Sequence, residues 1–111
     1  MRLTISGLQT RGGMNAREHH YARAKRVRTE RETVSWFLRG QVKPPLPCVV
    51  TLTRIAPSNG LDPFENLPSS LKGCVDAFAQ WIGVDDKDPA VRYVAKQERG
   101  PWSVRIEVQP A

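Results

Sequence analysis

Six acidic side chains gather between residues 62 and 88, a stretch that carries only two lysines and no arginine. The acids are Asp62, Glu65, Asp76, Asp85, Asp86 and Asp88, and the lysines are Lys72 and Lys87. Carboxylate oxygens are the ligands that Mg²⁺ and Mn²⁺ prefer, and a metal held in this way activates a water and stabilises charge on a phosphate. The stretch therefore favours metal-dependent phosphodiester hydrolysis. The competing interpretation is that these carboxylates cap helices, form ion pairs and solvate turns.

The spacing of these residues decides which of them can act together. Lys72 and Asp76 are four residues apart in a predicted helix, so they share one helix face. Asp62 and Glu65 precede that helix, and the Asp85–Asp86 pair follows it. A helix of about sixteen residues is about 24 Å long. Acids at its two ends therefore meet only if a following strand runs back beside the helix, or if a second copy of the chain supplies one of them.

Positive charge is concentrated in the first part of the chain. The formal net charge is +6, and residues 1–45 hold ten Lys and Arg against three acids. The predicted helix over residues 16–38 carries most of this charge, on Arg17, Arg23, Lys25, Arg26, Arg28 and Arg31. Such a helix suits contact with DNA phosphates, which would make binding depend strongly on salt. A solvated amphipathic helix is the alternative.

Hydrophobic periodicity predicts six elements. Strands are expected over residues 3–7, 48–55, 91–96 and 102–108, the last two joined as a hairpin, with helices over 16–38 and 66–82. Asn15 is the predicted cap of the first helix, and Gly83 closes the second. The order β-α-β-α-β-β predicts an α/β (α+β) fold, in which a small mixed sheet of about four strands packs with two main helices in one domain over residues 1–111.

Two apolar stripes should turn these helices toward the sheet. The first stripe is Tyr21, Ala24, Val27, Val34 and Leu38, and the second is Leu67, Leu71, Val75, Phe78 and Ile82. Cys48 and Cys74 stand among apolar neighbours and are expected to be buried free thiols. No apolar run approaches the about 20 residues of a membrane span, and no secretion signal is expected, which favours the cytoplasm.

The acidic stretch resembles the RusA-like Holliday-junction resolvases. Members of that family carry an Asp-x-Asp-Asn-Leu segment that leads into a helix with a lysine and a further acid, then an Asp-Asp pair after a glycine turn. This chain has Asp62-Pro63-Phe64-Glu65-Asn66-Leu67, then Lys72 and Asp76, then Gly83-Val84-Asp85-Asp86, with Lys96 in the next predicted strand. The resemblance covers residues 61–96 and extends more loosely over the N-terminal strand and basic helix. Asp62 stands one residue early, and Glu65 stands where the family usually has aspartate.

The resemblance implies a function and a set of roles. The chain would be a Mg²⁺- or Mn²⁺-dependent crossover junction endodeoxyribonuclease of recombination and repair, encoded by a phage or prophage. As a homodimer it would make paired nicks in branched DNA such as a four-way junction. Asp62, Glu65 and Asp86 would be metal ligands with Asp85 as an alternate, Lys72 would contact the phosphate, and Asp76 would orient Lys72. Apart from Lys96, the expected DNA contacts come from the basic charge and from the loop beside the proposed metal site rather than from the resemblance. They are Arg17, Arg23, Lys25, Arg26, Arg28, Arg31, Lys96 and Phe64, with Arg92 and Arg99 as weaker candidates.

Two other functions stay open at this point. A catalytically inactive RusA-fold dimer would bind DNA without cutting it. An unrelated basic α/β interaction module would use the same acids only structurally and would not prefer junctions over linear duplex.

Overall fold

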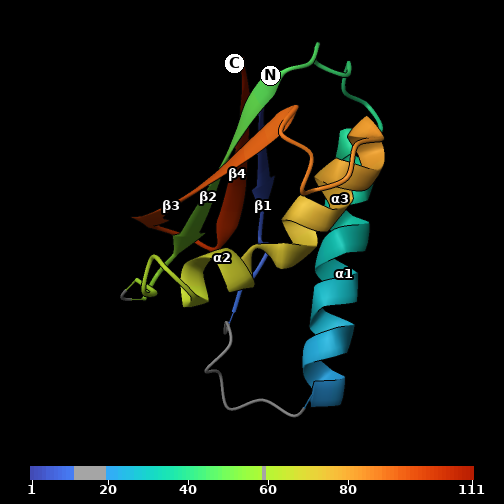
Figure 1. Cartoon of the computed structure of the whole chain (residues 1–111). Coiled ribbons are helices and arrows are strands. Elements are labelled where there is room, and N and C mark those ends of the chain that lie inside the picture. The colour runs from blue at the N-terminus through green and yellow to red at the C-terminus, as the bar shows by residue number, and fades with distance from the viewer. Residues whose placement is uncertain (12–19, 59) are drawn as a thin grey trace.

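The computed structural model describes residues 1–11, 20–58 and 60–111. The elements are β1 (Arg2–Ser6), α1 (His20–Leu38), β2 (Cys48–Ala56), α2 (Asn66–Ser70), α3 (Lys72–Ile82), β3 (Val91–Arg99) and β4 (Ser103–Pro110) (Figure 1). Residues 12–19 lie outside the described residues; they include the predicted cap Asn15, Arg17 and the start of the predicted first helix.

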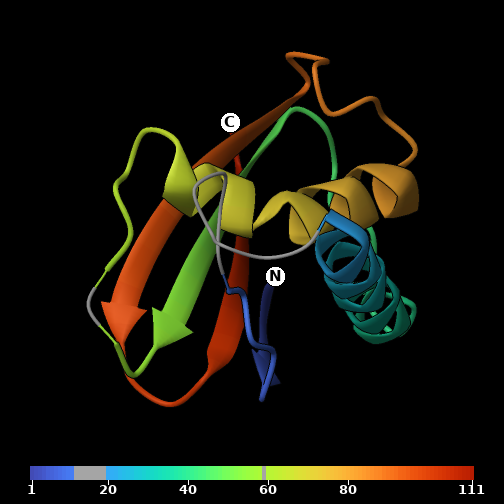
Figure 2. The same cartoon turned by 90° about the horizontal axis from the view of Figure 1, so that it is seen from below.

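The four strands form one mixed sheet in the order β1-β4-β2-β3. β4 runs antiparallel to both β1 and β2, whereas β2 and β3 are parallel. The helices lie over one face of this sheet (Figures 1 and 2). The predicted α+β fold with a mixed four-stranded sheet is therefore confirmed.

Strand alternation explains which face is covered. Successive side chains of a strand point to opposite faces, so alternate residues share an environment. Val50 and Leu52 of β2 are buried beside Val104 and Ile106 of β4, with Phe78 of α3 in the same core. β2 and β4 are both paired on two edges, and β2 is the most buried strand, which matches its nearly continuous apolar sequence.

The predicted hairpin between the last two strands is wrong. β3 and β4 are not neighbours, because each pairs with a different edge of β2. The connection passes the end of β2, where the Gly100 N–H donates to the Ala56 carbonyl oxygen at 3.0 Å. A turn-rich link between two apolar strands predicts a hairpin only if no third strand competes for the space between them. Here the segment from β2 through α2 and α3 to β3 forms a β-α-β crossover, which makes β3 parallel to β2.

The second predicted helix is divided at Leu71 into α2 and α3. The Ser70 hydroxyl donates to the Leu67 carbonyl oxygen at 2.7 Å. The Leu71 N–H donates to the carbonyl oxygen of Pro68, three residues earlier, whereas a regular α-helix would use that of Leu67, four residues earlier. This local bonding competes with the regular helical pattern. The apolar stripe survives the break, since Leu67, Leu71 and Phe78 are buried. Gly83 ends α3 in the left-handed conformation, as predicted.

The apolar stripe predicted for α1 is correct only in its second half. Val34 and Leu38 are buried, whereas Tyr21 is 71% exposed and Ala24 is exposed. The first turns of α1 extend past α3, the helix against which α1 packs (Figure 1). Tyr21 and Ala24 lie in these first turns and are exposed, so periodicity alone overestimated the buried length.

Candidate functional site

A basic groove lies between α1 and the α2–α3 segment. It has a volume of about 500 Å³. Its polar lining residues are Arg23, Arg28, Arg31, Ser69, Lys72 and Asp76. From the sequence, these arginines are expected to contact DNA and Lys72 is expected to contact the phosphate. Tertiary packing brings these five predicted residues, including Asp76, into one hollow.

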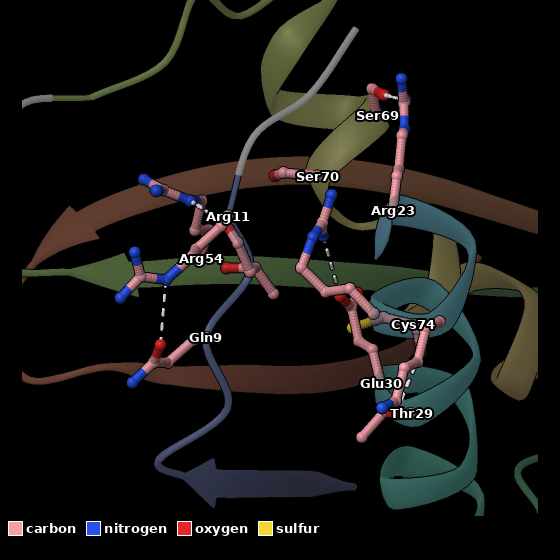
Figure 3. Close-up of polar contacts among 12 residues, drawn as sticks. Gln9, Arg11, Arg23, Thr29, Glu30, Arg54, Ser69, Ser70 and Cys74 are labelled. Carbon is pink, nitrogen blue, oxygen red and sulfur yellow. Dashed lines mark hydrogen bonds and ion pairs between the residues drawn. The ribbon is translucent and has the colours of Figure 1, made fainter. Parts of the chain in front are cut away.

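Close packing of the two helices sets the width of this groove. Gly73 of α3 lies so near α1 that a Cβ atom there would be 3.0 Å from the Val27 carbonyl oxygen. At the groove wall, an Arg23 guanidinium nitrogen donates to the Ser69 hydroxyl at 3.0 Å (Figure 3). Lys72 Nζ is 3.5 Å from Asp76 Oδ2, which confirms that these two side chains share a helix face. Of the cations that line the groove, Arg23 and Lys72 therefore have partners within it, and Asp76 is the carboxylate among them.

A second hollow, of about 400 Å³, opens at the other end of α3 and is acidic. Asp76, Asp85 and Asp86 line it, and the left-handed turn at Gly83 brings the last two there. The Lys87 N–H donates to Asp85 Oδ1 at 2.9 Å, and this hydrogen bond lowers the pKa of Asp85. Asp76 lines both hollows, so the basic groove and the acidic hollow meet at this residue.

Tyr93 of β3 lies close to the acidic hollow. Burial raises the pKa of its phenol, and the nearby charges of Asp86 and Asp76 raise it further. Its hydroxyl is buried and has no hydrogen-bond partner among the described residues. β3 thus runs back beside α3. A returning strand of this kind is one of the two ways in which acids at opposite ends of the predicted helix could meet.

Asp62 has a structural role in this fold. Its Oδ1 accepts the N–H groups of Phe64 and Glu65 at 3.2 and 2.9 Å, and its Oδ2 accepts that of Asn66 at 3.2 Å. These bonds, with that from Glu65 the strongest, lower the pKa of Asp62. The carboxylate therefore caps the turn that enters α2, and it does so through both oxygens. Glu65, the other ligand predicted in this loop, is exposed.

The predicted ligand set is not assembled within the described part of one chain. No group of three or more His, Cys, Asp or Glu side chains there is arranged so that it could hold a metal ion. Asp62 and Glu65 precede α2, whereas Asp85 and Asp86 follow α3. The separation expected for the two ends of this segment is thus present, and the turn at Gly83 brings only Asp76 into one hollow with the Asp-Asp pair.

The remaining predicted DNA contacts have different environments. Lys25, Arg28 and Phe64 are exposed, Phe64 at 88%. Arg26 turns inward instead, 3.8 Å from the buried Glu30, with its side chain 17% exposed. Lys96 pairs in register with Thr53, so it lies on the sheet face opposite the buried Leu52 and the helices. Lys96 and the basic groove therefore lie on opposite sides of the molecule.

Sequence reasoning missed two buried charged residues. Glu30 of α1 is 2% exposed, and the Cys74 thiol of α3 donates to its Oε1 at 3.4 Å (Figure 3). Arg54 is 3% exposed and lies on the covered face of β2. Strand alternation could have identified Arg54 as buried. It lies two and four residues from Leu52 and Val50, so its side chain points to the same covered face.

Comparison of the chain with family models, curated proteins and solved structures finds no match. The resemblance of residues 61–96 to the RusA-like resolvases therefore stays a prediction. Among the helices of the described residues, none has the length and apolar character to cross a membrane.

Proposed function

We propose that this chain is a Mg²⁺-dependent endonuclease that cuts branched DNA, as its resemblance to the RusA-like resolvases implies. The observation that carries the proposal is the position of Asp76, which joins the basic groove to the acidic hollow. A nuclease needs this adjacency, since cations hold the phosphate backbone while carboxylates serve the reacting phosphate.

The side chains around Asp76 support distinct parts of such a reaction. Arg23, Arg28 and Arg31 would hold the DNA backbone along α1. Lys72, paired with Asp76, would approach the scissile phosphate and stabilise the charge that develops on it. The exposed fork of an arginine suits phosphate oxygens, whereas lysine supplies a compact charge.

The residues at the acidic hollow fit a metal in their donor chemistry. Mg²⁺ in nucleases is commonly held by one or two carboxylates together with substrate phosphates, rather than by a complete protein cage. Asp85 and Asp86, next to Asp76, would hold Mg²⁺ there, and the bound ion would lower the pKa of a water for attack on phosphorus. Asp62 fits this role poorly because both of its oxygens already accept backbone N–H groups.

The proposed substrate and assembly come from the family resemblance. A homodimer has two-fold symmetry, which suits a four-way junction and paired nicks. A second copy is also the remaining way to bring Asp62 and Glu65 near an Asp85–Asp86 pair.

The deciding experiment is cleavage of a labelled four-way junction in Mg²⁺. We expect paired nicks from the native chain, and activity at least about 100-fold lower in Asp86→Asn and in Lys72→Ala, the scale of losing one electrostatic contact to the transition state. The matched controls are Glu32→Gln and Lys43→Ala, exposed residues outside both hollows, which should cut like the native chain. Undiminished cleavage by Asp86→Asn would contradict the assignment.

A catalytically silent DNA-binding dimer is the second candidate. The capping role of Asp62 and the lack of a three-acid group in the described residues favour it. It predicts tight junction binding that depends on Arg28 and Arg31, with no cleavage in Mg²⁺ or Mn²⁺. If the chain is instead an unrelated basic interaction module, we expect it to bind a junction and a linear duplex of the same length with equal affinity.

A further inference from the structure

A buried guanidinium lies at the end of the sheet opposite the loop of Asp85 and Asp86. Arg54 belongs to β2 and pairs in register with Gln97 of the parallel strand β3. Its residue neighbours on the same face are Leu52 and Ala56, both buried. A charged group at 3% exposure loses most of its hydration, which is costly unless partners replace the water.

The partners of Arg54 within the described residues are neutral or positive. Its Nε donates to the Thr10 carbonyl oxygen at 2.9 Å, and its guanidinium lies 5.3 Å from the centre of the Trp102 ring. Arg11 lies over the same ring at 5.5 Å (Figure 3 shows the two arginines). No carboxylate of the described residues forms an ion pair with Arg54, and burial alone lowers its pKa. Within residues 1–11, 20–58 and 60–111, the buried charge therefore has no counter-ion.

A cavity of about 290 Å³ opens beside this charge. Arg54, Ser58, Gly60, Gln97 and Arg99 line it, together with Glu98. The strand register places Glu98 on the opposite face of the sheet from Arg54 and Arg99. Gln97 and Arg99 pair with Arg54 and Ala56, whereas Glu98 pairs with Ile55 and so points to the opposite face.

Glu98 is fully engaged on that opposite face. Its two oxygens accept hydrogen bonds from the two terminal nitrogens of Arg105, at 2.9 and 2.6 Å. This pairing holds the pKa of Glu98 below its ordinary value. The acid is thus neutralised by Arg105, and the charges left facing the cavity are those of Arg54 and Arg99.

Two hydrogen bonds between Gln97 and Leu61 fix one wall of the cavity. Gln97 Oε1 accepts the Leu61 N–H at 2.9 Å, and Gln97 Nε2 donates to the Leu61 carbonyl oxygen at 2.8 Å. Gly60 lies against the same amide, because a Cβ atom there would be 2.8 Å from Gln97 Oε1. The chain at Gly60 and Leu61 is therefore tied to β3, which fixes this wall of the cavity.

We propose that this cavity binds a phosphate group through the guanidinium groups of Arg54 and Arg99 and the hydroxyl of Ser58. A phosphate offers the several acceptor oxygens that arginine forks bind well. The volume lies at the small end of ligand pockets, which suits a small anionic group. The cavity shares no lining residue with the basic groove or the acidic hollow, so the proposal does not rest on the nuclease function. The phosphate group can belong to a free anion or to a nucleic-acid strand, and the experiment separates these sources.

The test begins with thermal unfolding of the native chain in inorganic phosphate and in chloride of equal ionic strength. We expect phosphate to raise the unfolding midpoint in a saturable manner, because a ligand that binds only the folded state stabilises it. Arg99→Gln should weaken this apparent affinity about tenfold, the loss of one charge-assisted contact. Arg92→Gln, an exposed residue of the same strand that points to the other face, should change nothing.

Arg54→Gln is the second variant and should lose the phosphate effect. If it does not fold, as judged by circular dichroism, Arg99→Gln decides the question because Arg99 is exposed. Lys72→Ala should keep the full phosphate effect, which separates this site from the nuclease groove. Equal midpoints in phosphate and chloride, or an unchanged affinity in Arg99→Gln, would overturn the proposal.

A labelled single-stranded oligonucleotide identifies the source of the phosphate. If the cavity takes a phosphate of a nucleic-acid strand, Arg99→Gln weakens oligonucleotide binding and inorganic phosphate competes with the strand. If it takes a free phosphate, the oligonucleotide affinity of Arg99→Gln equals that of the native chain while its apparent affinity for inorganic phosphate is weakened. Either result supports the site.

Discussion

At the scale of single residues, burial decides whether an acid is a structural or a chemical group. Glu30 is buried between α1 and α3, and desolvation raises its pKa to about 7 from an ordinary 4.5. Its hydrogen bond from Cys74 and the charge of Arg26 only partly offset that cost. The folded chain therefore holds a proton on Glu30 more tightly than the unfolded chain does.

This pKa gives a direct prediction for stability. Because the folded pKa is raised, the contribution of Glu30 is fully present below about pH 4.5 and is lost as the pH rises through about 7. Glu30→Gln should remove this loss. At pH 8 the variant should therefore exceed the native chain in free energy of unfolding by about 3–4 kcal/mol, at about 1.4 kcal/mol per pH unit between 4.5 and about 7. Urea unfolding at pH 5 and pH 8 measures it. The exposed Glu32→Gln is the control, and a pH dependence in Glu30→Gln equal to that of the native chain would refute the prediction.

Asp62 provides the opposite case, an exposed acid whose hydrogen bonds lower its pKa. Its stabilising effect should be present above its ordinary pKa and lost as the pH falls below it. Asp62→Ala should lower the unfolding midpoint at neutral pH even in EDTA, because three backbone N–H groups lose their acceptor. Glu65→Ala, in the same loop, should leave the midpoint in EDTA close to native. A loss of stability in Asp62→Ala that appears only when Mg²⁺ is present would instead indicate a metal ligand.

At the scale of elements, the contact between α1 and α3 determines the basic groove. Gly73 permits this contact, since a Cβ atom would approach both the Val27 carbonyl oxygen and the Glu30 side chain at 3.0–3.2 Å. One obstacle is backbone and cannot rotate away. The groove between Arg28 and Lys72 therefore depends on a residue that has no side chain.

Gly73→Ala tests this packing. The helix gains intrinsic propensity of up to about 1 kcal/mol, yet overpacking typically costs about 1–3 kcal/mol. We expect a net loss of about 1 kcal/mol in the free energy of unfolding, together with weaker DNA binding as α1 shifts. Gly40→Ala is the control, because a Cβ atom there meets nothing within 4 Å. A Gly73→Ala chain as stable as native would show that the helices separate without cost.

At the scale of the whole molecule, cations on the two faces of the sheet are expected to contribute differently to DNA binding. The helices and the basic groove lie on one side, and Lys96 lies on the other. DNA binding to a four-way junction should weaken linearly with the logarithm of salt concentration, with a slope of about −0.9 for each phosphate contact. Arg28→Gln combined with Arg31→Gln should reduce this slope by about 2, whereas Lys96→Gln should leave it unchanged. Fluorescence anisotropy across a salt series measures both, and a change confined to Lys96→Gln would place the DNA on the open face.

The sequence by itself determined the element types and most of the pairings within an element. Periodicity of about two or of 3.6 residues predicted the strands and helices, since it depends only on which side chains avoid water. The Lys72–Asp76 pair, the glycine end of α3 and the buried thiols followed from the same local reasoning and are confirmed. The proposed chemistry also came from the sequence and still awaits the cleavage experiment.

Only the tertiary structure decided how those elements combine. The position of β2 between β3 and β4, the exposure of Tyr21, the burial of Arg54 and the separation of Asp62 from Asp86 depend on contacts between residues distant in the chain. Local patterns do not encode such contacts, because several strand orders bury the same apolar faces almost equally well. Which charged residues share a hollow is thus a property of the packing, and the meeting of Arg28, Lys72 and Asp76 in one groove could be read only from the folded chain.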